Sequence, residues 1–415
     1  MKTVLDSDLI ARLQRVPSYV WTFIALIVGI GLGGWLPGPL KPVADATALL
    51  IRGIVAIVPI LILAALSPAI ATLVRRGLAG RFAASVILWY VLSSTIAGLL
   101  GLFVSSLLFG IPFSTGETDG WGEAANMLRL FAQQSGASLP LIAIVSSVVF
   151  GVIGAWVEPL YRFYSKIEKG IAAAGNKMGY VMAPLILLFG ISLGVKFGAR
   201  MGMGHYFSMT LYTAVLCFFW FLFYVFVIVG FFAKRPIKPL IKDYYLPTAL
   251  FAAGTCSSLA TLPVNLANVK KVGVRDEVAD FVLPFGAVAN MDASALMYVA
   301  YAPFVVTFVF GMEISWVTML MAAPALLLFT IAAPGLPAGM GTALWTATLF
   351  ASMLGLEEPE KSNFVLTWLA LSGGLPDMFR TATNCTGDGF SAILFDSFFD
   401  KFRPSRAGSS EGETR

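Results

Sequence analysis

Residues 373–390 read GGLPDMFRTATNCTGDGF and lie within the last long apolar segment of the chain. Four polar side chains recur in this stretch at helical spacing: Asp377, Arg380, Asn384 and Asp388. Because an α-helix turns about 100° per residue, they fall within roughly 80° of one another, with Thr381 at the edge of that face. A charge at bilayer depth costs about 2.5 to 3.5 kcal/mol, so these side chains need partners, a cavity or a ligand. A polar face of this kind is typical of a segment that handles a solute.

The composition of the whole chain indicates an integral membrane protein. Of its 415 residues, 58% are hydrophobic and only 12% are charged, far from a soluble domain. A helix needs about 20 mainly apolar residues to cross a bilayer. Stretches of this kind lie near 17–36, 46–74, 82–110, 140–156, 178–198, 206–233, 278–311 and 362–397. Two more, near 239–269 and 315–352, are interrupted by Pro and Gly. We therefore expect an all-α membrane protein with eight transmembrane helices and two interrupted segments.

Basic residues alternate from loop to loop along this pattern. Lys and Arg gather before the first span, after the second, fourth and sixth, before the seventh and after the eighth. Cytoplasmic loops carry such an excess, so we expect a multi-pass protein of the cell membrane with both termini cytoplasmic. The net charge of +5 is thus a topology signal, and no basic stretch is interleaved with stacking aromatics, which argues against nucleic-acid binding. Three scattered cysteines and one histidine argue against a disulfide framework or a zinc site.

The C-terminal half repeats one pattern twice. The interrupted segment 239–269 leads into a span that carries Asn290-Met291-Asp292, and the interrupted segment 315–352 leads into the span with Asn384 and Asp388. A loop-tipped hairpin followed by a polar helix, repeated, is typical of transporters built on inverted repeats. Irregular backbone is tolerated at membrane depth where it lines a cavity instead of lipid.

Four motifs in this half resemble those of a known family. They are TCSSLATLPV (255–264), NMDAS (290–294), PGLPAG (334–339) and DMFRTATNCTGD (377–388). In order and spacing they resemble the dicarboxylate/amino acid:cation symporters, the family of the glutamate and aspartate transporters, over roughly 240–400. The resemblance implies two re-entrant hairpins in the interrupted segments and an elevator-type transporter that assembles as a homotrimer. It also implies scaffold spans in 1–75 and 123–205, transport-domain segments in 76–122 and 206–400, and a tail, 401–415, whose polar composition predicts disorder.

The resemblance also implies roles for the polar face in binding substrate. Asp377 would accept from a substrate amino group, and the planar guanidinium of Arg380 would take a side-chain carboxylate. The implied substrate-binding residues are Ser257, Ser258, Ser294, Gly335, Asp377, Arg380, Thr381 and Asn384. The alternative is that Asp377 and Arg380, three residues apart on one helix, only neutralise each other. A buried pair without a task is a poor stability device, which favours the functional interpretation.

By the same resemblance, Asp292 and Asp388 would be ligands of co-transported Na⁺, with H⁺ as the alternative cation. Oxygen ligands suit Na⁺, and an unwound helix supplies free carbonyls. One site would combine Asp388 with Gly286, Asn290 and Asn384. A second would combine Asp292 with Asn290, Tyr90, Ser93 and Ser94. A third would use carbonyls near Val288, Thr330, Ile331 and Ala333. For each hydroxyl taken singly, a bond back to its own helix is an equally good explanation.

Departures from the family pattern leave the substrate open. Cys256 and Met378 stand where many acidic-substrate relatives carry an extra arginine, and Gly373 stands where an acidic residue often supports the arginine. Tyr298 replaces the glutamate of proton-coupled, potassium-exchanging animal relatives. Relatives that carry C4-dicarboxylates tend to lose the Asp377 carboxylate, and those that carry neutral amino acids lose the arginine. Both groups are retained here.

The sequence therefore predicts a secondary-active symporter that imports L-aspartate or L-glutamate with Na⁺, and not an enzyme. A C4-dicarboxylate or neutral amino acid symporter is the alternative within the class, and an anion channel is the alternative outside it. An intramembrane aspartyl protease using Asp292 and Asp388 is disfavoured, because Cys385-Thr386-Gly387 does not complete a Gly-x-Gly-Asp turn and Arg380 would perturb the dyad. The expected partners are the small anionic substrate, membrane lipid and further copies of the chain.

Overall fold

The computed structural model describes residues 18–77, 81–114, 121–122, 125, 138–331 and 340–402. Every regular element in these ranges is helical, which confirms the all-α expectation. The N-terminal elements are α2 (Ser18–Trp35), α3 (Pro37–Gly77), α4 (Arg81–Phe109), α6 (Ser138–Trp156) and α7 (Glu158–Leu222). They are followed by η1 (Phe223–Phe232), α8 (Ile237–Leu240), η2 (Ile241–Tyr245), α9 (Leu246–Thr255), α10 (Ser258–Lys271), α11 (Asp276–Ala289) and α12 (Asp292–Pro303). The last elements are η3 (Phe304–Val309), α13 (Trp316–Ile331), α14 (Met340–Met353), α15 (Glu360–Ser372), α16 (Leu375–Phe398) and η5 (Phe399–Phe402).

Several helices are built to lie in lipid. Among the described residues, Arg81–Phe109, Ala183–Phe232 and Asp276–Val309 are long and apolar enough to cross a membrane. On α4 the outer face exposes large apolar side chains such as Leu88 (68%) and Leu107 (70%), while Ser93 and Ser94 are buried. This is the reverse of the pattern of a soluble helix, whose polar side faces solvent. It places the polar groups of α4 in the protein interior.

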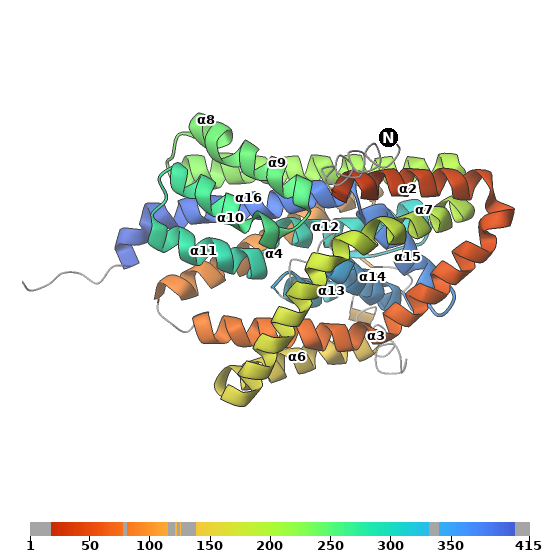
Figure 1. Ribbon diagram of the computed structural model, residues 1–415, viewed down its shortest axis with the longest axis horizontal. Helices are drawn as coiled ribbons and strands as arrows, with labels where there is room; N and C mark the ends of the chain where they lie inside the picture. The colour runs from red at the N-terminus through yellow and green to blue at the C-terminus, as the bar shows by residue number, and fades with distance from the viewer. Residues whose placement is uncertain are drawn as a thin grey trace, which may run out of the picture.

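Glycines allow the N-terminal helices to approach closely. α2 packs along α7, and α3 packs along α6 (Figure 1). A Cβ at Gly29 would lie 2.5 Å from the carbonyl oxygen of Leu187, and one at Gly190 would lie 2.6 Å from that of Leu26. Only glycine permits such backbone contact, as is common between membrane helices. α7 itself bends at Gly198, where φ is 75° and ψ is 161°.

The C-terminal half is divided by non-helical residues where the sequence predicts interruptions. α9 ends at Thr255, Cys256 is left-handed (φ 49°), and the Ser257 Oγ accepts from the Ala260 N–H at 3.3 Å to begin α10. α9 and α10 contact each other, so they form a helical hairpin. α13 and α14 likewise contact each other, and the predicted tip between them, 332–339, lies outside the described residues.

Two further breaks lie in the helices that follow the interrupted segments. Asn290 and Met291 are non-helical and separate α11 from α12, as the sequence predicts. The expected single span 362–397 is wrong in one respect, because Gly373 and Gly374 divide it into α15 and α16. Gly374 has a φ of 69°, a conformation that side chains with a Cβ avoid, and the new helix begins at Leu375 with Pro376 in its first turn.

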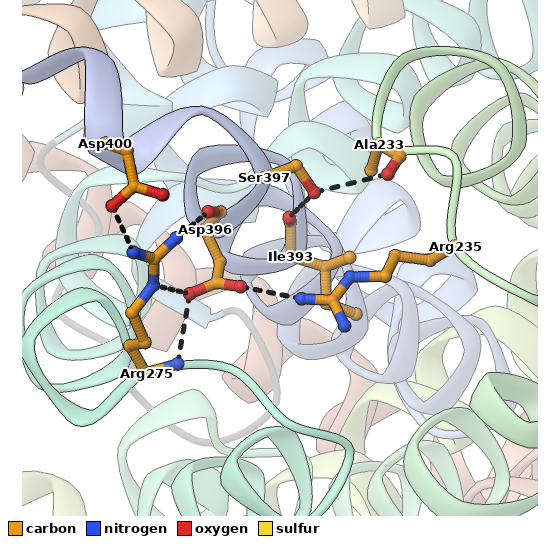
Figure 2. Close-up of polar contacts among 7 residues, drawn as sticks. All are labelled: Ala233, Arg235, Arg275, Ile393, Asp396, Ser397 and Asp400. Atoms are coloured by element: carbon orange, nitrogen blue, oxygen red, sulfur yellow. Dashed lines mark hydrogen bonds and ion pairs between the residues drawn. The ribbon is translucent and has the colours of Figure 1, made fainter.

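At one end of the molecule, α9, α10, α11 and α16 gather together (Figure 1). A carboxylate joins three segments there. Asp396, near the end of α16, is 3% exposed and accepts from Arg275 Nε at 2.8 Å and from Arg235 Nη2 at 2.7 Å (Figure 2). Arg275 also donates to Asp400 at 2.7 Å, and these hydrogen bonds raise its pKa. We call Arg235, Arg275, Asp396 and Asp400 the arginine clamp. It fixes the end of η1 and the start of α11 to α16.

Candidate functional site

The first part of the site is an ion pair on α16. Asp377 and Arg380, three residues apart, are 1% and 2% exposed and are joined by a hydrogen bond from Arg380 Nη2 to Asp377 Oδ1. The guanidinium lies 5.6 Å from the ring centre of Tyr298. One atom of each charged group, Asp377 Oδ2 and Arg380 Nη1, is buried without a partner among the described residues. Because buried polar atoms are normally satisfied, this acceptor and this donor, unpaired in the described ranges, are suited to a ligand.

The second part surrounds Asp388, two turns along the same helix. Its Oδ1 accepts from Asn290 Nδ2 at 3.0 Å, across the break between α11 and α12. A Cβ at Gly286 would lie 2.5 Å from Asp388 Oδ1 and 2.6 Å from Tyr90 Oη, so the absence of a side chain brings these groups together. Asn290 Oδ1 has no partner among the described residues. Asp388 Oδ1, Tyr90 Oη and Asn290 Oδ1 are oxygens of the type that a hard cation prefers. The first two lie beside Gly286, and the third lies at the break between α11 and α12.

The third part surrounds Asp292, at the start of α12. Ser93 and Ser94 donate to its Oδ1 at 2.9 and 3.1 Å, so α4 and α12 meet at this carboxylate. The other oxygen, Oδ2, accepts from the Tyr224 hydroxyl. The carboxylate is 1% exposed. Three hydroxyl donors from two different elements, α4 and η1, therefore stabilise the buried carboxylate.

Asn384 lies one helical turn after Arg380 on α16 and bonds to the start of α12, beside the break that separates α11 from α12. Its Oδ1 accepts from the backbone N–H of Ala293 at 2.9 Å, and its Nδ2 donates to Ser294 Oγ at 3.1 Å. α16 and the first turn of α12 are thus held together by a single amide. This satisfies an N–H that the start of a helix would otherwise leave unpaired.

The first hairpin also lies against α16. Cys385 Sγ lies 3.6 Å from Ser258 Oγ, and Asn265 Nδ2 donates to the Cys385 carbonyl oxygen at 2.6 Å. Tyr244 donates to the next carbonyl, that of Thr386, at 2.9 Å. The hairpin tip is therefore placed one helical turn from both Arg380 and Asp388.

The other predicted residues divide into three groups. Tyr90 donates to the Val282 carbonyl at 2.9 Å instead of to Asp292, and Thr330 bonds back to Leu327 in its own helix at 2.7 Å. Ser257 caps α10, and Thr381 is buried, at 7% exposed. The side chains of Val288 and Ile331, and the residues Ala333 and Gly335, lie outside what the structure describes.

Sequence reasoning missed Tyr224, Tyr244 and Asn265. Tyr224 lies in the apolar run FFWFLFYVFVIVGFF, where a phenol needs a buried partner, and that requirement was the available signal. Asn265 follows the first hairpin motif, and an amide in an apolar helix raises the same question. Neither sequence distance nor composition identifies the partner, because Tyr224 lies 68 residues from Asp292 and Asn265 lies 120 from Cys385.

Comparison with known proteins identifies this arrangement. The model of the sodium:dicarboxylate symporter family matches residues 19–398. The chain belongs to this family. The proton/sodium-glutamate symport protein of Bacillus subtilis is 24% identical over 93% of this chain and 93% of its own length. C4-dicarboxylate transport protein 2 of Mesorhizobium japonicum is 26% identical over 73% of this chain and 74% of its own length. The neutral amino acid transporter B(0) of the rat is 32% identical, over 39% of this chain and 27% of its own length.

Membership of the sodium:dicarboxylate symporter family fixes the general function. The protein is a multi-pass membrane transporter, not an enzyme, and it couples a small substrate of the dicarboxylate or amino acid kind to Na⁺ or H⁺ symport. The buried carboxylates, hydroxyls and guanidinium described above are polar groups in the interior of helices that face lipid on their outer sides. Such groups at membrane depth mark a solute or ion pathway.

Proposed function

We propose that this symporter imports L-aspartate or L-glutamate together with Na⁺. The observation that carries the proposal is the buried pair in which one atom of each partner, Asp377 Oδ2 and Arg380 Nη1, has no hydrogen-bond partner within the part of the chain that the structure describes. An acidic amino acid brings an ammonium group for the first and a carboxylate for the second. Both groups of the protein are then satisfied without breaking the bond that joins them.

The two alternative substrates satisfy this pair less well. A C4-dicarboxylate has no cationic group, so it would bring a negative charge near Asp377 with nothing for Oδ2 to accept. A neutral amino acid has no side-chain acceptor, so Arg380 Nη1 would stay buried and unpaired. Leaving a buried charged group incompletely paired is costly, and sites discriminate against ligands on this basis.

Na⁺ is the proposed coupling cation because the groups around Asp388 and Asp292 are oxygens. Asp388 and Tyr90 both border the space beside Gly286, and Ser93 and Ser94 border Asp292. A hydroxyl that donates to a carboxylate still has lone pairs for a cation. A bound Na⁺ would neutralise a carboxylate beside the substrate site, so cation and substrate would each strengthen binding of the other.

We further propose an elevator mechanism in which 76–122 and 206–400 move as a transport domain against a trimeric scaffold of 1–75 and 123–205. Contacts of α12 with both α4 and α16, and the bend of α7 at Gly198 near the proposed boundary, support this division. Cysteine cross-links between α4 and α12 should then leave transport intact, whereas cross-links between α3 and α14 should arrest it. Native mass spectrometry should give three copies, and thiol labelling should place both termini on the cytoplasmic side.

The decisive test is uptake into proteoliposomes. Labelled L-aspartate, L-glutamate, succinate and L-serine would be compared with and without an inward Na⁺ gradient. We expect saturable, concentrative, Na⁺-driven uptake of the acidic amino acids. Arg380→Ala and Asp377→Asn each remove a charged hydrogen bond worth about 1.5–3 kcal/mol, so KM should rise about 10- to 150-fold.

Thr383→Ala is the matched control, because Thr383 is half-buried on α16, donates to the Phe379 carbonyl of its own helix at 2.8 Å and has Cys217 as a further polar neighbour, and none of these groups belongs to the proposed site. It should transport like the unmodified protein. Uptake of succinate alone, or of L-serine alone, would overturn the acidic amino acid assignment. Flux that never exceeds equilibrium would instead favour an anion channel.

A further inference from the structure

A tyrosine outside the predicted cation ligands holds one of the two acidic side chains. Tyr224, at the start of η1, is 1% exposed, and its hydroxyl donates to Asp292 Oδ2. Its ring stacks on Phe390 of α16, with centroids 5.6 Å apart and planes 25° from parallel. Trp220 packs edge-on against the same ring at 5.6 Å. The phenol is therefore fixed in direction by packing on two sides.

The two oxygens of Asp292 are held from different elements. Oδ1 receives the hydroxyls of Ser93 and Ser94 on α4, and Oδ2 receives the hydroxyl of Tyr224 on η1. A serine hydroxyl turns freely and offers lone pairs once its proton turns away. A phenol O–H stays near the plane of its ring, so packing on two sides of the ring restricts its donor to two in-plane directions, one of which meets Asp292 Oδ2.

Tyr224 also touches the helix that carries the other acidic side chain. A Cβ at Gly387 would meet Tyr224 Cε2 at 3.4 Å, an ordinary contact distance, and Gly387 directly precedes Asp388. One side chain thus bonds to the carboxylate on α12 and packs against α16 beside the carboxylate there. The ring stack on Phe390 extends this contact along α16.

We propose that Tyr224 is a positioning residue of the cation site at Asp292. Its hydroxyl holds Oδ2, so that Oδ1 and the two serines are directed toward the cation. Its ring holds α12 and α16 in place relative to each other. The proposal rests on the proposed function in taking Na⁺ as the coupled cation and Asp292 as one of its ligands. Groups that orient a metal ligand typically contribute 10- to 100-fold to metal affinity, so removal of this hydroxyl should be visible in Na⁺ binding.

The test compares Tyr224→Phe with Tyr212→Phe. Tyr212 is also buried, at 8% exposed, and bonds to Ser105 at 2.6 Å, but no carboxylate is its partner in the described contacts. Half-maximal Na⁺ concentrations would be measured in two ways: for the rise in melting temperature in detergent, with choline as the replacement ion, and for substrate uptake. We expect about a tenfold higher value in Tyr224→Phe by both readouts, with uptake at saturating Na⁺ within about twofold of the unmodified protein, and no change in Tyr212→Phe.

A second variant guards against misfolding. Phe390→Leu keeps the hydroxyl and removes the ring stack, so it should raise the half-maximal Na⁺ concentration less, in the same direction. Unchanged Na⁺ dependence in a folded Tyr224→Phe protein, or an equal shift in Tyr212→Phe, would overturn the positioning role and leave the proposed function standing. Absence of any Na⁺ response in the unmodified protein would overturn both the role of Na⁺ and this proposal.

Discussion

Replacement of Gly286 by alanine tests the geometry of the cation site directly. Gly286 lies in α11, one turn before the break at Asn290. The added Cβ would lie 2.5 Å from Asp388 Oδ1 and 2.6 Å from Tyr90 Oη, and a Cβ essentially never lies closer than 3.0 Å to another heavy atom. Neither neighbour can yield freely, because Asp388 is held by Asn290 and Tyr90 is held by the Val282 carbonyl.

Two opposing effects set the stability of Gly286→Ala. Alanine favours a helix interior over glycine by about 1 kcal/mol, and overpacking costs about 1–3 kcal/mol. The net loss is therefore at most about 2 kcal/mol, which leaves a protein that folds. The site itself is far more sensitive, because relief of the contact moves a ligand oxygen by about 0.5 Å or more, the limit within which functional groups must be held.

We therefore expect the Na⁺ concentration for half-maximal uptake to rise about tenfold or more in Gly286→Ala. The matched control is Gly98→Ala on α4, where the Cβ would meet Val299 at 3.6 Å, an ordinary contact. That variant should keep its Na⁺ dependence and melt at a slightly higher temperature. Unaltered Na⁺ dependence of Gly286→Ala would refute the assignment of the space beside Gly286 to a cation.

Two other predictions concern stability. Asp396→Asn removes the charge shared by two arginines whose side chains are 33% exposed, so it should lower the free energy of unfolding by about 1–3 kcal/mol and lower the melting temperature. Asp400→Asn changes an exposed carboxylate, so it should lower the free energy of unfolding by less than about 1 kcal/mol. Equal effects of the two would contradict the central role of Asp396 in the clamp. Asn265→Ala leaves the Cys385 carbonyl without its side-chain donor, so it should lower the melting temperature more than Asn268→Ala, whose amide bonds to Thr248 at the half-buried edge of α10. A larger loss in Asn268→Ala would show that the first hairpin is not held to α16 by Asn265.

Much of the site follows from helical spacing and the energetics of the bilayer. Asp377, Arg380, Asn384 and Asp388 are all at most 5% exposed, as expected for polar groups that lipid excludes. The break at Asn290 was also predictable, because polar residues and a change of apolar pattern coincide there. These features are local, and local spacing is enough to find them.

The remaining features depend on contacts between distant segments. The span 362–397 divides at Gly374 because of backbone conformation, which its apolar composition conceals. Tyr90 is itself one of the predicted cation ligands, and its proton goes to a carbonyl on α11. Tyr224 reaches Asp292 because η1 packs against α16. No spacing rule along one helix contains this information.

The arginine clamp has a consequence for the order of events during synthesis. Asp396 lies 161 residues after Arg235, a delay of roughly 8–32 s at about 5–20 residues per second. Until then both arginines are free cations, of the kind that retains a loop on the cytoplasmic side during insertion. Asp396 of α16 then pairs with both arginines, and Asp400 of η5 pairs with Arg275. A chain released before residue 396 keeps both arginine charges and lacks the carboxylate that joins the end of η1 and the start of α11 to α16.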